Sequence, residues 1–265
     1  STMPAPQRRY PANPHPTAWS DDEWRIRVDL AAAYHLVDYF GWTELIYGHL
    51  TARVPGPDHH FLINPYGLNY DEVTASNLVK IDLDGNRVDA TEHSVNEAGF
   101  VIHSAIHMSA EVENQVVMHT HTRAGMAVAA QAGGLRQISM NATMFHGDLA
   151  YHDYEGPSLY LDERDRLLAS LGGKRAMILR NHGLLTVGDT VPAAFLRLYR
   201  LERACQVQID AGAPDSFTEI SDNVAARSGA DTAAFSTNDD GFGQLEFNAL
   251  LRKLDQRPAA RAYAQ

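Results

Sequence analysis

Cysteine is nearly absent from this chain: among 265 residues the only one is Cys205. A single cysteine excludes an internal disulfide and is typical of a reducing compartment, so we expect a cytoplasmic protein. The apolar helical pattern around Cys205 predicts a buried thiol and not a nucleophile. Long hydrophobic runs are also missing, since no apolar stretch approaches the ~20 residues that a transmembrane helix requires. We therefore expect no membrane partner.

Basic residues are too few and too scattered for a nucleic-acid-binding protein. Lysine and arginine together number 22 against 33 acidic residues, which gives a formal net charge of −11. Proteins that bind a phosphate backbone concentrate Lys and Arg against it, whereas the one basic cluster here is Arg8-Arg9. We expect a small-molecule substrate as the partner and no nucleic acid.

Three regions differ in composition. Residues 1–16 are rich in proline and predict an arm that is disordered or wraps a neighbouring subunit. Residues 17–212 interleave strand and helix patterns and predict one α/β domain. Residues 213–265 begin with a polar segment typical of a linker and end with "QLEFNALLRKLDQ", which predicts an amphipathic helix that docks on a partner subunit or on the body of the chain.

Within the central region, the local signals are clear at several points. Ser20-Asp-Asp-Glu23 has the capping-box pattern, and apolar residues follow it at helical spacing until Gly41, so we expect a first helix there. The runs "LIYGHLTARVPG", "HHFLINPYG" and "LVKIDLDGNRV" predict antiparallel strands. The runs "QVVMHTHT" and "RAMILRNHGLLTVG" predict further strands, both buried.

Two histidines one residue apart, His119 and His121, end the apolar run in "NQVVMHTHTRAG". With 13 histidines in the chain, random placement alone gives roughly 0.6 such pairs, so the pair needs further support. On a strand, both rings would point to the same face. His182, in a second apolar strand, supplies a third imidazole, and three imidazoles with an open position are typical of catalytic zinc. The alternative is a set of hydrogen-bonded core histidines.

An acidic partner for these histidines is harder to choose. Glu97 is the candidate, but Ser94-Val-Asn-Glu97 is also a capping box that would open the next helix. His103 and His107 lie four residues apart on that predicted helix, yet the intervening residues lack the glutamate of the H-E-x-x-H zinc motif. We expect both to lie in the core or beside the metal ligands.

Five motifs in the same order make the chain resemble the class II aldolase/adducin family: "YGHLTARVPG", "FLINPYGL", "NEAGFVIHSAIH", "VVMHTHTRAG" and "LRNHGLLTVGDTVPAAF". The resemblance covers roughly residues 20 to 212. It implies an α/β/α sandwich with a central, mainly antiparallel sheet. It also implies a homotetramer whose active sites lie between subunits.

The resemblance assigns residues as well. His119, His121 and His182 would hold a divalent ion, Zn²⁺ first and Mn²⁺, Fe²⁺ or Co²⁺ as alternatives. Glu97 is the nearest match to the family's catalytic acid, although sugar-phosphate aldolases place theirs four residues before the histidine that aligns with His103, where this chain has Gly99.

The sequence also departs from the phosphate-binding segments of those aldolases. It has Gly48-His49, Asn64-Pro65-Tyr66-Gly67 and Val95-Asn96 in their place. The departures favour a non-phosphorylated substrate and the adducin-like branch of the family. Asn64, Gly67 and Asn96 are the residues that we expect to line the substrate end of the site.

The resulting hypothesis is a divalent-metal-dependent carbon–carbon lyase. It would act on a small hydroxy- or oxo-carboxylic acid by retro-aldol cleavage or decarboxylation, through a metal-stabilised enolate. Two alternatives stay open: a non-catalytic interaction protein like the adducin head, and an iron-dependent oxygenase on the same three histidines.

Overall fold

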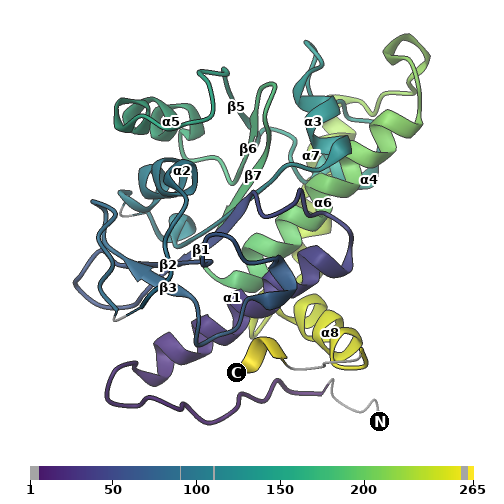
Figure 1. The fold of residues 1–265 in the computed structure, drawn as a ribbon. Coiled ribbons are helices and arrows are strands. Elements are labelled where there is room, and N and C mark those ends of the chain that lie inside the picture. Colours follow the sequence, from purple (N-terminus) through teal and green to yellow (C-terminus); the bar gives the residue numbers. More distant parts are fainter. Residues whose placement is uncertain (1–5, 90, 110, 258–261) are drawn as a thin grey trace.

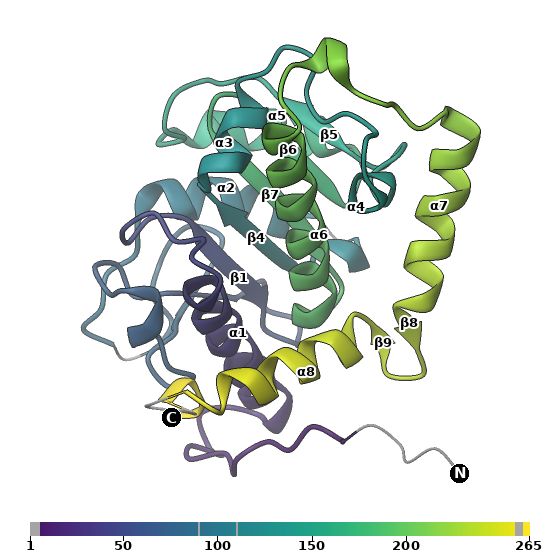
Figure 2. The same ribbon diagram turned by 90° about the vertical axis from the view of Figure 1, so that its right-hand side faces the viewer.

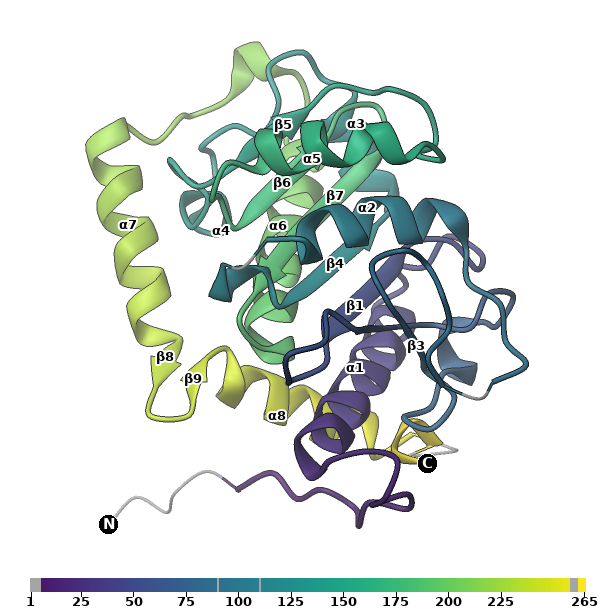
Figure 3. The same cartoon turned by 90° about the vertical axis from the view of Figure 1, so that its left-hand side faces the viewer.

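The computed structural model describes residues 6–89, 91–109, 111–257 and 262–265, and it has three layers. A seven-stranded sheet in the order β3-β2-β1-β4-β7-β6-β5 forms the middle, and all neighbours are antiparallel except β5 and β6. Helices α1 and α6 cover one face (Figure 2), and α2 and α5 cover the other (Figure 3). The predicted α/β/α sandwich with a mainly antiparallel sheet is confirmed (Figure 1).

The elements have the following bounds. The strands are β1 His49–Arg53, β2 Phe61–Ile63, β3 Val79–Ile81, β4 Val116–Thr120, β5 Ala150–His152, β6 Ala176–Leu179 and β7 Gly183–Gly188, with a separate hairpin of β8 Thr237–Asn238 and β9 Gly241–Phe242. The helices are α1 Asp21–Tyr39, α2 Glu97–His107, α3 Arg123–Ala129, α4 Met140–Thr143, α5 Arg164–Leu171, α6 Val191–Asp210, α7 Asp222–Phe235 and α8 Gln244–Leu254.

Strand β4 lies at the centre of the sheet and shows why each layer faces its own core. Successive side chains of a strand point to opposite faces. Val116 and Met118 accordingly join the apolar cluster of α1 and α6, whereas Val117 joins that of α2 and α5. His119 follows in the same alternation, which directs its ring toward the α2 side of the sheet.

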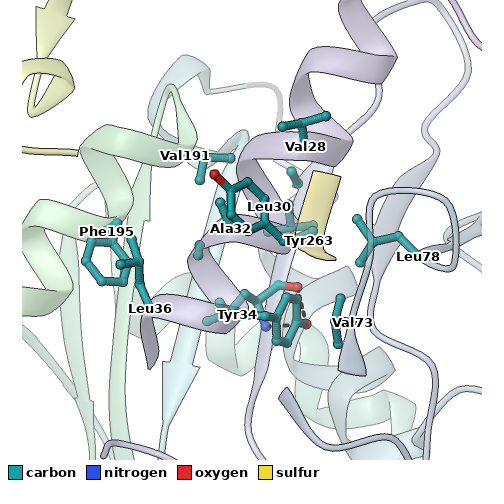
Figure 4. Close-up of a cluster of buried hydrophobic side chains, with 14 of the residues drawn as sticks. Val28, Leu30, Ala32, Tyr34, Leu36, Val73, Leu78, Val191, Phe195 and Tyr263 are labelled. Atoms are coloured by element: carbon teal, nitrogen blue, oxygen red, sulfur yellow. Dashed lines mark hydrogen bonds between the residues drawn. The ribbon is translucent and has the colours of Figure 1, made fainter. Parts of the chain in front are cut away.

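Helix α1 begins and ends where the sequence predicts. The Ser20 hydroxyl accepts a hydrogen bond from the Glu23 N–H at 3.1 Å, and Gly41 adopts a φ of +73° just beyond the helix. Val28, Leu30 and Leu36 are buried between α6 and the loops that follow β2 (Figure 4). The Tyr34 hydroxyl donates to the Leu50 carbonyl at 2.6 Å, which ties α1 to β1.

Arg27 is a fully buried charge on the same helix. Its guanidinium donates to Glu23 Oε2 at 2.8 Å and to Asp89 Oδ2 at 2.7 Å, and it stacks 3.9 Å from the Trp19 ring centroid. It also donates to two backbone carbonyls, those of Ala75 and Leu78. Removal of Arg27 would therefore take a partner from two backbone carbonyls and from the buried carboxylate of Glu23, which Lys80 also contacts at 2.9 Å.

The terminal regions contain more contacts than a loose arm and a linker would. Residues 6–16 have no regular structure, but Arg8 forms an ion pair with Asp29 of α1 at 2.7 Å. The polar segment after Gly212 contains α7, which contacts α4 through Thr143 and Ser228. Its helix starts at a Ser221 cap and is rich in alanine, two local signals that the polar composition masked.

Helix α8 packs on α1 and α6 of its own chain, and its Phe247 lies 5.9 Å from Phe195 between ring centroids. Residues 1–5 of the expected arm lie outside the described residues, and the division at positions 16 and 212 stays a prediction. Among the helices described here, none has both the length and the apolarity to cross a bilayer.

The Arg27 cluster makes a prediction about stability. Replacing Arg27 by Met keeps the apolar stem but removes one of the two cations paired with buried Glu23, and Lys80 remains as the other, so we expect the free energy of unfolding to fall by about 3 kcal/mol. Urea denaturation monitored by circular dichroism measures the loss. Arg25→Met on the exposed side of α1 is the matched control and should change the value by less than about 0.5 kcal/mol. Equal effects of the two variants would contradict this view of Arg27.

Candidate metal centre

The three predicted histidines meet where β4 ends and β7 begins. His119 pairs with Leu185 across the β4–β7 ladder, and His121 follows the last residue of β4. His182 lies in the turn between β6 and β7 and not within a strand, so the prediction of one long strand over residues 175–188 is wrong. Asn181, with a φ of +58°, turns the chain there and delivers His182 to the end of β4.

Gly183 permits this approach. A Cβ atom at position 183 would collide with the Thr120 carbonyl oxygen and would stand 3.2 Å from the His121 ring and 3.4 Å from the His119 ring. The absence of a side chain at Gly183 therefore lets the start of β7 pack directly against the end of β4 and the two histidine rings.

The imidazoles point at one place. Their ring centroids are separated by 4.7 Å for His119 and His121, and by 4.8 Å from each of these to His182. One ligand atom from each residue lies within 4.8 Å of the others. His119 Nε2 and His121 Nε2 are 2.9 Å apart.

Hydrogen bonds on the far side of each ring leave those Nε2 atoms available. His119 Nδ1 lies 2.8 Å from the Leu184 carbonyl oxygen and His121 Nδ1 lies 3.2 Å from Glu44 Oε1. Both partners only accept, so each Nδ1 carries the proton and each Nε2 presents a lone pair. Two facing lone pairs repel each other unless a cation or a proton lies between them, and ligand nitrogens around a tetrahedral ion lie roughly 3.3 Å apart. The site thus fits a divalent ion.

Burial keeps the His119 and His182 rings neutral. It lowers the pKa of His119 well below its ordinary value, with the neighbouring histidines adding to the shift, and it lowers the pKa of His182 to about 4. A metal ion requires deprotonated ligands. At neutral pH these imidazoles need not lose a proton before they bind one.

Comparison with known proteins gives the family. The model for the class II aldolase and adducin N-terminal domain matches residues 28–209. The chain belongs to this family. The resemblance that the five motifs indicated is therefore confirmed.

Relatives of this class II aldolase/adducin domain include both enzymes and adducins. An aldolase II superfamily protein from Pseudomonas syringae is 48% identical, with a TM-score of 0.86 over 93% of this chain and 97% of the other. An L-fuculose 1-phosphate aldolase from Glaciozyma antarctica is 32% identical, with a TM-score of 0.73, and the match covers 90% of this chain and 89% of that protein. Mouse alpha-adducin is 42% identical over 90% of this chain, which spans 34% of that protein.

Glu44 is the residue of the domain's site that the sequence did not indicate. Its carboxylate accepts from His121 Nδ1 across a sequence separation of 77 residues, and the loop that carries it turns at Leu45, where φ is +51°. Carboxylates that bond to the outer nitrogen of a metal-binding histidine fix its tautomer and orientation. No local pattern marks Glu44 for this position.

A second layer of histidines lies behind the site. His49 pairs with His119 across β1 and β4, and its Nδ1 lies 3.1 Å from Asn64 Oδ1. His103 and His107 of α2 both contact the Thr51 hydroxyl, at 2.5 and 2.7 Å. The prediction that His103 and His107 are core histidines is confirmed, since both are buried.

His49 also accounts for Gly99. A Cβ atom at position 99 would stand 2.6 Å from His49 Cδ2, so the imidazole fills the space that a side chain on this turn of α2 would take. The departures at Gly48-His49 and at Gly99 are therefore one change in packing. A glutamate at position 99 is incompatible with the observed His49 ring.

The remaining predicted site residues take other positions. Glu97 is the exposed first residue of α2, and the cap is the Asn96 side chain, which accepts from the Ala98 N–H at 3.0 Å. The predicted Ser94 cap is wrong, because helical geometry starts two residues later. Asn64 is buried, and its Oδ1 also lies 3.0 Å from the Tyr34 hydroxyl oxygen. Gly67 lies in an exposed turn with a φ of +99°.

The buried histidines predict how acid destabilises the metal-free protein. Burial lowers the pKa of His49 to about 4 and of His107 to about 3, against about 6.5 in the unfolded chain. Below pH 6.5 the unfolded state binds more protons, so the free energy of unfolding falls as pH falls, by about 1.4 kcal/mol per unit for each residue until the folded pKa is reached.

Urea denaturation at pH 7.5 and 5.5 in the presence of a chelator measures this dependence. We expect His107→Asn to make the dependence shallower and His59→Asn, at an exposed position, to leave it unchanged. A stability that is the same at both pH values would contradict the neutral, buried state of these rings.

Proposed function

We propose that the domain is a divalent-metal-dependent carbon–carbon lyase whose ion is held by His119, His121 and His182. The convergence of the three imidazoles, with the Nδ1 atoms of His119 and His121 bonded outward, is the observation that supports it. Three nitrogen ligands favour Zn²⁺, with Mn²⁺, Fe²⁺ and Co²⁺ as alternatives. When bound, such an ion acts as a Lewis acid that stabilises negative charge on an oxygen of the substrate.

The chain's own residues would orient the ligands and move a proton. Glu44 holds the His121 ring, and the Leu184 carbonyl holds the His119 ring. In retro-aldol cleavage a base takes the proton of the substrate's β-hydroxyl group, and that oxygen becomes the carbonyl oxygen of one product. The bond between the α and β carbons breaks, and its electrons form an enolate with the neighbouring carbonyl group. The enolate then takes up a proton to give the second product. We propose Glu97 as that base, because it begins the helix whose Gly99 packs on His49 beside the site.

A non-phosphorylated hydroxy- or oxo-carboxylic acid is the proposed substrate. The side chain of Asn64 is engaged with Tyr34 and His49 in the interior, so its oxygen is used before any substrate arrives. Asn96 caps α2 with its own side chain. Of the three proposed substrate contacts, Gly67 and Asn96 are thus expected to act through the backbone turns that they form.

An apolar rim beside the site supports assembly. Tyr154 lies 6.0 Å from His182 between ring centroids, and Leu159, Tyr160 and Leu161 follow it with 45%, 73% and 53% exposure. Contiguous exposed apolar side chains mark interaction surfaces. We propose that this segment contacts a second copy in a homotetramer, which light scattering should report as four chains per particle; a monomer would contradict it.

An adducin-head-like interaction protein is the second candidate. The 42% identity to mouse alpha-adducin favours it. A scaffold, however, gains nothing from three converging lone pairs. Metal content therefore separates the lyase from the interaction protein. A metal-bearing protein that consumes oxygen when it is given hydroxy- or oxo-carboxylic acids would instead be the iron-dependent oxygenase.

Elemental analysis of the purified chain tests the proposal. We expect His119→Ala to lose the ion, because it removes one of three ligands. Glu44→Gln keeps the ring contact but weakens it, so metal affinity should fall about 10- to 100-fold. Glu92→Gln is the matched control at an exposed position and should change neither value.

Absence of metal at the three-histidine site in the unchanged chain would contradict the lyase. If metal is present, incubation with hydroxy acids should release an aldehyde or pyruvate for aldol cleavage and carbon dioxide for decarboxylation.

A further inference from the structure

A second group of metal-ligating side chains lies near the end of β5. His152 ends that strand, Glu155 lies in the loop that follows, and Glu163 directly precedes α5. Glu163 Oε2 is 3.0 Å and Glu155 Oε2 is 3.3 Å from the same nitrogen, His152 Nε2. One ligand atom from each of the three residues lies within 4.8 Å of the others.

The surroundings orient each donor. His152 Nδ1 lies 2.7 Å from the Ser170 hydroxyl, which leaves Nε2 to face the two carboxylates. Arg166 binds both oxygens of Glu155, and Oε2 also faces His152 Nε2 at 3.3 Å. The side chains of His152 and Glu163 are only 7% and 6% exposed, so the buried Glu163 carboxylate needs a partner, which is either the His152 N–H or a bound cation.

There is room for one ion. A cavity of about 10 Å³ is lined by His152, Glu155 and Glu163, and also by His182. That volume suffices for the centre of a single water molecule or ion. The cavity thus collects all three donors around a space of ionic size, next to the first centre.

We propose that His152, Glu155 and Glu163 form a second divalent-cation site. One imidazole and two carboxylates suit Mn²⁺ better than the three imidazoles of the first centre do, since oxygen ligands favour Mn²⁺ and nitrogen ligands favour Zn²⁺. The site does not depend on the lyase activity. A His152 ring whose Nε2–H merely donates to the two carboxylates is the competing explanation.

Mn²⁺ binding to the full-length double variant His119→Ala/His121→Ala tests the site, because that chain lacks the first centre. Electron paramagnetic resonance counts the free ion. We expect about one Mn²⁺ per chain to remain bound, and we expect a further Glu163→Gln change to weaken binding more than about 100-fold, since a ligand contributes more than the outer contacts that account for 10- to 100-fold. Glu111→Gln, at an exposed carboxylate, should leave binding unchanged.

Loss of all Mn²⁺ binding in the double variant, or binding that Glu163→Gln does not alter, would overturn the proposal. If the double variant does not fold, the count is made in the otherwise unchanged chain, where Glu163→Gln should remove one ion. A Glu163→Gln chain that melts at a lower temperature by the same amount with and without Mn²⁺ would instead show a structural His152 contact. A failed lyase assay affects none of these outcomes.

Discussion

The antiparallel pairing of β4 with β7 is the constraint on which the site depends. Its register sets His119 opposite Leu185. The β6–β7 turn then lies next to the end of β4, so that His182 reaches the rings of His119 and His121. A shift of one residue would send the ring of His119 to the opposite face. The apolar cores on the two faces prevent such a shift, because Val116, Val117 and Met118 would all exchange environments.

The same pairing explains how several imidazoles are tolerated in the interior. Burying a polar ring is costly unless its nitrogens have partners. The β4–β7 ladder supplies the Leu184 carbonyl, α2 and β1 supply the Thr51 contacts of His103 and His107, and the loop after α1 supplies Glu44. Three separate parts of the fold therefore orient the histidines. A metal ion between His119 and His121 would satisfy the Nε2 atoms that their outer contacts leave.

Local patterns predicted α1, several strands and the meeting of the three histidines, but not α7 or the division of residues 175–188 into β6 and β7. The cap at Ser20 and the stop at Gly41 are short-range signals, and α1 follows them. Strand alternation placed His119 and His121 on one face because it depends only on the backbone. Residues 175–188 form two strands with a turn at Asn181 in place of one strand, and α2 begins two residues later than the Ser94 pattern predicts, with Asn96 as its cap.

The features that could not be predicted are those made by tertiary contact. Glu44 reaches His121 from 77 residues away, and the three donors near β5 come from a strand, a loop and the turn before a helix. The filling of the Gly99 position by His49 likewise joins two segments that only the sheet brings together. Helix α7 was hidden for a different reason, since its polar sequence buries only Ala225 and Thr232 and so lacks an apolar stripe.

Anomalous diffraction at the zinc edge from crystals of the Zn²⁺-loaded chain tests the central claim most directly. We expect a peak at ~2.0–2.1 Å from Nε2 of His119, Nε2 of His121 and a ring nitrogen of His182. A map without a peak between these three rings would contradict it.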